Sequence, residues 1–226
     1  AQVGLIVFHA SLLPFWSEIM ALAIAPPVHA SETTTIPADY TIAPLTVEQY
    51  HAMVAAGILE EGAPIELLEG YLVEKMTKHP PHRLATQLVE RRLGAILPPG
   101  FHTAAQEPIT LADSEPEPDV AVLRGDIYDY GERHPYANEV CLVVEIADAT
   151  LQRDRISKRR IYARAGIVSY WIVNLVDRYV EVYTMPSGNT LHPSYRNQQS
   201  LSEDDLLELI IDGEVVGRLA VRSILP

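Results

Sequence analysis

The sequence of 226 residues contains few cysteines, no early basic residues and no long apolar segment in its main part. Cys141 is the single cysteine, so no disulfide can form within the chain and a zinc site built from several cysteines is excluded. A lone thiol is typical of a reducing compartment, and we therefore expect a cytoplasmic protein. No run of about 18 or more apolar residues follows position 30, which argues against an integral membrane protein.

The start of the chain is apolar but lacks positive charge. No Lys or Arg precedes Lys75, so residues 3–16 do not have the basic start that a secretory signal peptide needs. Two interpretations stay open for this region: translation starts at Met20, or the region is a loose anchor segment. In both cases we expect residues 1–40 to be a poorly ordered extension and residues 41–226 to form a single domain.

Acidic residues outnumber basic residues by 30 to 17, which gives a formal net charge of −13. This excess argues against a protein that coats nucleic acid by bulk electrostatics, because phosphate binding needs local positive charge. One stretch does concentrate positive charge, and its members are Arg153, Arg155, Lys158, Arg159, Arg160 and Arg164. These residues either contact nucleic-acid phosphates or form an ordinary solvated helix face.

Hydrophobic periodicity and turn residues predict a domain of mixed helices and strands. The predicted elements are a helix at 45–57, a β-hairpin turning at Glu69–Gly70, a helix at 79–97, strands at 102–111, 118–123 and 140–146, a helix at 154–165, a strand at 169–174 and a hairpin at 178–192. The strand–helix–strand spacing of residues 140–174 predicts two parallel strands joined by a right-handed crossover.

Glu145 interrupts the most hydrophobic segment of the chain. Strand alternation predicts Leu142, Val144 and Ile146 on one face and Cys141, Val143, Glu145 and Ala147 on the other. Burying an ionised carboxylate costs several kcal/mol unless the group is paired or bound to a metal. Glu145 is therefore either a metal ligand or a strand-end residue that meets water or pairs with an arginine.

Two further positions have side chains suited to the same chemistry. Asp119 follows Pro118 where a polar loop enters a strand, and carboxylates at neighbouring strand edges can hold a hard divalent cation. The alternative for Asp119 is an Asx-turn. Asp154, Lys158 and Tyr162 recur every four residues, so they share one face of the predicted helix. The alternative for Lys158 is an exposed ion pair with Asp154.

Two carboxylates and a lysine at the ends of adjacent strands form the minimum set for metal-assisted hydrolysis of a phosphodiester. The metal lowers the pKa of a bound water and neutralises charge on the phosphate. The lysine either orients or deprotonates that water, or stabilises the pentacovalent phosphorus.

The order of these motifs resembles that of a known family. The motifs are IELLEG at 65–70, PD at 118–119, VVE at 143–145, DRISKRRIY at 154–162 and GIVSYWIVN at 166–174. In this combination they resemble the Uma-two family of restriction-type endonucleases, which is part of the PD-(D/E)XK nuclease superfamily. The resemblance extends from about Leu45 to the C-terminus.

The resemblance implies an α/β (α+β) fold, with a restriction-endonuclease-like mixed β-sheet flanked by helices. It further implies Mg²⁺ or Mn²⁺ as cofactor, DNA as substrate and a possible homodimer. Asp119 and Glu145 correspond to metal ligands, and Lys158 and Glu66 complete the implied catalytic set. Weaker candidates are His82, Glu69, Asp154 and Tyr162. The implied DNA contacts are Arg153, Arg155, Lys158, Arg159 and Arg160.

The chain also departs from the family pattern. The superfamily lysine that normally lies two residues after the acid is replaced by Ala147, so its role would pass to Lys158. Members commonly read EVxSPST where this chain reads EIADAT at 145–150, and Asn174 replaces a usual aspartate. Three functions therefore stay open: a metal-dependent DNA endonuclease, a catalytically inactive nuclease-fold module for binding or assembly, and a hydrolase of smaller phosphoesters.

Overall fold

The computed structural model describes residues 39–60 and 62–226. Residues 43–226 form one compact unit that carries the helices and strands named below. Met20 and nearly all of the predicted extension at 1–40 lie outside the described residues. Within the described residues, no helix combines the length and the apolar character needed to cross a membrane.

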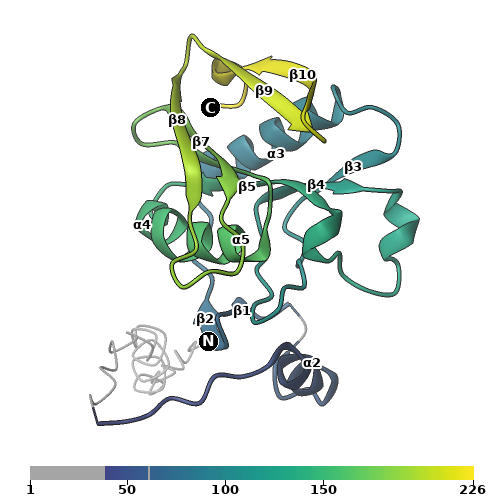
Figure 1. Ribbon diagram of the computed structural model, residues 1–226, viewed down its shortest axis with the longest axis vertical. Coiled ribbons are helices and arrows are strands. Elements are labelled where there is room, and N and C mark those ends of the chain that lie inside the picture. Colours follow the sequence, from purple (N-terminus) through teal and green to yellow (C-terminus); the bar gives the residue numbers. More distant parts are fainter. Residues whose placement is uncertain (1–38, 61) are drawn as a thin grey trace, which may run out of the picture. The chain divides into compact units, whose positions relative to one another are not determined.

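A six-stranded mixed sheet forms the centre of this unit (Figure 1). In their order across the sheet, the strands are β3 (Phe101–Ala104), β4 (Val120–Arg124), β5 (Val140–Ala147), β6 (Ser169–Asn174), β7 (Tyr179–Pro186) and β8 (Tyr195–Ser202). Neighbours are antiparallel except β5 and β6, which run parallel and are joined through a helix. The predicted parallel pair is thus confirmed, as is the mixed fold class.

Each face of the sheet is covered by other elements. Helix α3 (Pro80–Gly94) and the C-terminal hairpin of β9 (Leu206–Ile211) and β10 (Glu214–Ala220) pack on one face (Figure 1). The helical segment that follows β5 packs on the other face. This segment consists of α4 (Leu151–Arg153), a π-helical turn η3 (Asp154–Lys158) and α5 (Arg159–Ala165).

All eight residues of β5 are buried, as the continuous apolar run predicts. The alternation holds from Leu142 onward, but Cys141 packs in the same cluster as Leu142. The pairing with β4 skips one residue here, because Val122 pairs with Leu142 and the next residue pairs with Val140. This β-bulge turns Cys141 away from the Glu145 face, so the predicted position of Cys141 is wrong.

A second, two-stranded sheet carries Glu66. It is the predicted hairpin of β1 (Ile65–Leu68) and β2 (Tyr71–Glu74). Its turn has positive φ at both Glu69 (52°) and Gly70 (80°), the geometry of a type I′ turn. Helix α2 (Val47–Ala55) begins beyond Thr46, whose side chain forms a capping box, and the chain just before it pairs with the carbonyl of Gly70.

Two predicted strands have other bounds in the structure, and one hairpin was not predicted. The strand predicted at 102–111 ends at Ala104, because Gln106 has φ 60° and Pro108 has no N–H to continue the ladder. The second strand of the 178–192 hairpin lies at 195–202 instead. The acidic C-terminal segment forms β9 and β10, which the sequence reading did not predict. The remaining short 3₁₀ helices are η1 (Ile127–Tyr130), η2 (Ala137–Glu139) and η4 (Val221–Ser223).

The turn glycine of the first hairpin provides a stability test. A Cβ atom on Gly70 would lie 2.4 Å from Cβ of Pro44, whereas Gly213 has a similar φ of 85° and open space around it. We expect Gly213→Ala to cost about 1 kcal/mol of unfolding free energy from backbone strain. Gly70→Ala should cost at least about 2 kcal/mol, because the clash adds to the strain. Urea unfolding of both variants measures the difference, and equal losses would contradict the close packing at Gly70.

Candidate active site

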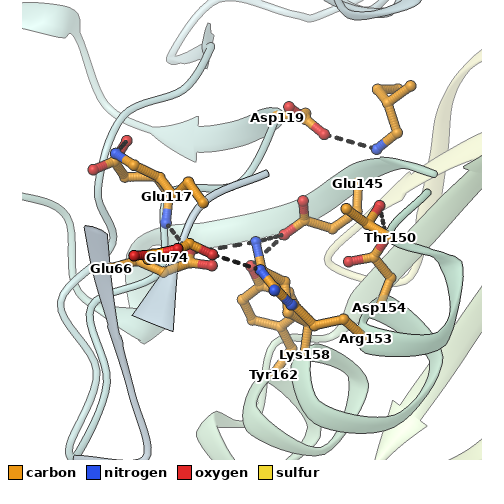
Figure 2. A network of polar contacts seen from close by, with 12 residues as sticks. Glu66, Glu74, Glu117, Asp119, Glu145, Thr150, Arg153, Asp154, Lys158 and Tyr162 are labelled. Atoms are coloured by element: carbon orange, nitrogen blue, oxygen red, sulfur yellow. Dashed lines mark hydrogen bonds and ion pairs between the residues drawn. The ribbon is translucent and has the colours of Figure 1, made fainter. Parts of the chain in front are cut away.

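The pairing of β4 with β5 places two acidic side chains at the same level of the sheet. Val120 pairs with Val144, so Asp119, one residue before β4, falls beside Glu145. The backbone N–H of Ile146 donates a hydrogen bond to Oδ2 of Asp119 at 2.9 Å, which ties the two strand ends together. Both acids are about 95% buried, yet both line an open cleft (Figure 2).

Lys158 reaches this pair from the π-helical turn η3. Its Nζ lies 2.9 Å from Oε1 of Glu145 and 3.4 Å from Oε2 of Glu66 on β1 (Figure 2). Only 6% of Lys158 is exposed. The structure therefore brings together the four residues of the implied catalytic set, although they come from four separate elements.

Burial acts on the charges of this group in opposite directions. It raises the pKa of Glu145, against the opposing effect of the Lys158 ammonium. Burial alone would lower the pKa of Lys158, but the carboxylates around it, Glu145 first, raise that pKa above its ordinary value. The lysine therefore carries a proton at neutral pH.

Two weaker candidates on the same helical face also join the site. The hydroxyl of Tyr162 donates to Oε1 of Glu145 at 2.7 Å. Asp154 accepts a hydrogen bond from the hydroxyl of Thr150 at 2.7 Å, and burial raises the pKa of Asp154 to about 6. Oε1 of Glu145 thus has two donors, whereas Oε2 has no hydrogen bond among the residues that the structure describes.

His82 lies beside Asp119 and also lines the cleft. It belongs to the first turn of α3, and its Nε2 is 3.1 Å from Oδ2 of Asp119. Burial would raise the pKa of Asp119, but the bond to His82 and the N–H of Ile146 hold it below its ordinary value. Oδ1 of Asp119 has one charged neighbour, Lys78, whose Nζ is 3.6 Å away.

These residues line a cleft that opens to solvent. Its carboxylates are Glu66, Glu117, Asp119, Glu145, Asp148 and Asp154, and its cationic side chains are Lys75, Lys78, Arg153 and Lys158. Six acids and four bases give the cleft a formal charge of −2. The sequence analysis did not identify Lys75 and Lys78 as cleft residues. The feature that sets them apart in the sequence is that they are the first two Lys or Arg residues of the chain.

The donor set suits a hard divalent cation that keeps much of its water. In residues 39–60 and 62–226, no three His, Cys, Asp or Glu side chains gather closely enough to form a complete metal cage. Asp119 and Glu145 instead offer two carboxylates, each with one oxygen that accepts no hydrogen bond from a described residue. Mg²⁺ is commonly held by one or two carboxylates and retains several waters, so the residues fit such an ion.

Glu69, in contrast, lies outside the cleft. Its carboxylate sits between Arg160 and Arg164, with Oε1 accepting from Nε of Arg160 at 2.9 Å and from Arg164 at 2.8 Å. Arg164 also binds Asp113, at 2.9 Å. This network fastens the turn of the first hairpin to α5, which gives Glu69 a structural position.

The predicted basic helix face is also largely occupied. Arg155 binds the buried Glu181 of β7, Arg160 binds Glu69, and the guanidinium of Arg159 lies 5.5 Å from the ring centre of Tyr183. Lys158 is buried in the cleft. Of the five residues implied as DNA contacts, Arg153 is thus the one that lines the cleft without a carboxylate partner among the described residues.

In this α+β fold, two carboxylates at adjacent strand ends of a mixed sheet lie beside a lysine from the helical segment that follows β5. Residues 47–216 match the model of the Uma2 family, described as "Putative restriction endonuclease". The chain belongs to this family, so the resemblance noted from its motifs is confirmed.

A solved structure supports the same fold. It is described as a "putative nuclease belonging to DUF820 from Anabaena variabilis ATCC 29413" and superimposes with a TM-score of 0.60 at 15% sequence identity, covering 80% of this chain and 97% of the other. A comparison with curated proteins gave no match. Family and fold together suggest a nuclease.

The Glu69 network predicts a stability effect with a defined pH dependence. Hydrogen bonds from Arg160 lower the pKa of Glu69 below 4.5, so its stabilisation is present above that pH and is lost as the carboxylate becomes protonated. Glu69→Gln should lower the unfolding free energy by on the order of 1 kcal/mol near pH 7, and the difference should shrink near pH 3.

Urea unfolding at both pH values measures this difference. The control is Glu208→Gln, which removes an exposed ion pair with Arg218. This change should lower the unfolding free energy by about 0.5 kcal/mol or less. A Glu69→Gln loss that is no larger than the control would contradict the structural role of the network.

Proposed function

We propose that the chain is a metal-dependent endonuclease that hydrolyses DNA phosphodiester bonds. The observation that supports this most directly is the buried Glu145–Lys158 pair, 2.9 Å between Oε1 and Nζ, beside the carboxylate of Asp119. Burying a cation and two carboxylates at the floor of an open cleft lowers the stability of the fold, because these charges lose most of their hydration. Such a cost is typical of a catalytic site.

Asp119 and Glu145 would hold Mg²⁺ or Mn²⁺ through the oxygens that have no hydrogen bond. A bound divalent ion would lower the pKa of a water and neutralise charge on the phosphate. His82 and the N–H of Ile146 fix Oδ2 of Asp119, and Tyr162 fixes Oε1 of Glu145. These contacts orient the two remaining oxygens and limit their motion.

Lys158 would act as a charged donor. Its raised pKa keeps the ammonium protonated at neutral pH, so it suits orienting the attacking water or stabilising charge on the pentacovalent phosphorus better than removing a proton. Glu66 is its second partner at 3.4 Å and holds the ammonium in place. Asp154 and Thr150 lie on the same cleft wall and support this arrangement.

The proposed substrate is DNA, which the family description as restriction endonucleases favours. Arg153 lines the cleft and donates one N–H to the carbonyl of Glu74 at 3.1 Å, so its other N–H groups have no described partner and are available to a phosphate. Two active sites would allow both strands of a duplex to be cut in one binding event. We therefore keep the homodimer as a prediction.

One observation favours the alternative of a catalytically inactive nuclease-fold module. Asp148 and Ala149 stand where the family pattern EVxSPST has Ser and Pro, and Asp148 adds a sixth carboxylate to the cleft. An inactive module would fold normally but show no dependence of melting or activity on divalent cations.

Cleavage and metal binding decide between these functions. With Mg²⁺ or Mn²⁺, wild type should cut DNA, and Asp119→Asn, Glu145→Gln and Lys158→Met should each lower the rate by about 10²-fold or more. Calorimetric titration of Mn²⁺ should show binding to wild type and loss of binding in Asp119→Asn.

The matched control is Glu181→Gln, which alters a buried carboxylate on β7 outside the cleft. It should retain the wild-type rate per folded molecule. Equal cleavage by wild type and the three cleft variants would contradict the assignment of the site, and absence of both Mn²⁺ binding and cleavage in wild type would support the inactive module.

A further inference from the structure

The four cationic side chains of the cleft differ in how they are paired. Nζ of Lys75 lies 2.7 Å from Glu117, and Nζ of Lys158 lies 2.9 Å from Glu145. Lys78 makes no hydrogen bond to any described residue, and its side chain is 36% exposed. Lys78 and Arg153 are thus the two cleft cations that lack a hydrogen-bonded carboxylate within the described part of the chain.

The position of Lys78 relative to Asp119 is specific. Oδ2 of Asp119 is occupied by Ile146 N–H and His82, whereas Oδ1 faces the ammonium of Lys78 at 3.6 Å. The ammonium therefore stands at the same oxygen through which Asp119 would hold a divalent ion.

Electrostatic repulsion disfavours the two arrangements at the same time. A divalent cation at Oδ1 of Asp119 would repel an ammonium only a few ångströms away, and no hydrogen bond to a described residue holds the Lys78 side chain in place. The cleft has a formal charge of −2 without a metal, which disfavours a phosphodiester. One divalent ion cancels this charge, and a released lysine then adds three unpaired N–H donors.

We propose that Lys78 binds a phosphate of the substrate strand, and that it covers Oδ1 of Asp119 until a divalent ion displaces it. Arg153, from α4, is the second phosphate contact, and together Lys78 and Arg153 form a phosphate subsite of the cleft. The ligand is thus the anionic backbone of DNA at the phosphates that enter the cleft. This inference rests on the proposed function and adds a substrate-binding residue to it.

The subsite predicts two opposite effects of one substitution. Lys78→Gln removes the cation that competes for Asp119, so the affinity for Mn²⁺ should rise several-fold. The same change removes a phosphate contact, so DNA affinity in the presence of Ca²⁺ should fall about tenfold near physiological salt, with a salt slope smaller by about 1. A loss of folding would weaken both kinds of binding instead.

Two variants serve as controls. Lys75→Gln removes the same charge from the same loop, but that lysine is bound to Glu117, so it should change neither affinity by more than about twofold. Arg153→Gln should weaken DNA binding with little effect on Mn²⁺ affinity, because Arg153 contacts a backbone carbonyl and no metal-ligand candidate.

The experiment uses the full chain, with calorimetry for Mn²⁺ and fluorescence anisotropy of labelled DNA in Ca²⁺ over a salt series. Opposite shifts in Lys78→Gln, with Lys75→Gln unchanged, support the inference. If wild type binds Mn²⁺ and DNA but Lys78→Gln changes only one affinity or neither, the inference is overturned and the proposed function stands. If wild type binds neither Mn²⁺ nor DNA, both the proposed function and this inference are wrong.

Discussion

The contact between Glu145 and Lys158 is the interaction on which the rest of the site depends. Neither group is stable as a buried, unpaired charge, so each requires the other. The pair fixes the helix after β5 against the β1–β2 hairpin, because Lys158 also reaches Glu66. The ion pair therefore links the helical segment to the hairpin at the wall of the cleft, beside the apolar cluster that the two elements share.

Much of this centre could be predicted from local sequence patterns. A carboxylate within a continuous apolar strand, an aspartate after a proline at a strand entry, and a four-residue repeat on a helix each carry a physical signal, and Glu145, Asp119 and Lys158 do meet. The parallel pairing of β5 and β6 could be predicted equally well, because the segment that connects them has the length of one helix.

The remaining features depend on contacts between distant segments, which periodicity does not report. The bulge at Cys141 arises from pairing with β4, and the partners that neutralise Arg155 and Arg160 lie on β7 and in the first hairpin. A basic stretch in a sequence therefore does not show whether its charges face solvent. Lys78 was missed for a similar reason, because its significance appears only from its position beside Asp119.

The π-helical turn of η3 makes the position of Lys158 depend on β6. The hydroxyl of Tyr170 on β6 donates to the carbonyl of Asp154, the first residue of this turn, at 3.1 Å. Tyr170 is itself fully buried, and its ring stacks with the rings of Tyr183 and Tyr195. A change in this aromatic packing would therefore shift the backbone that carries Lys158, although none of the three tyrosines lines the cleft.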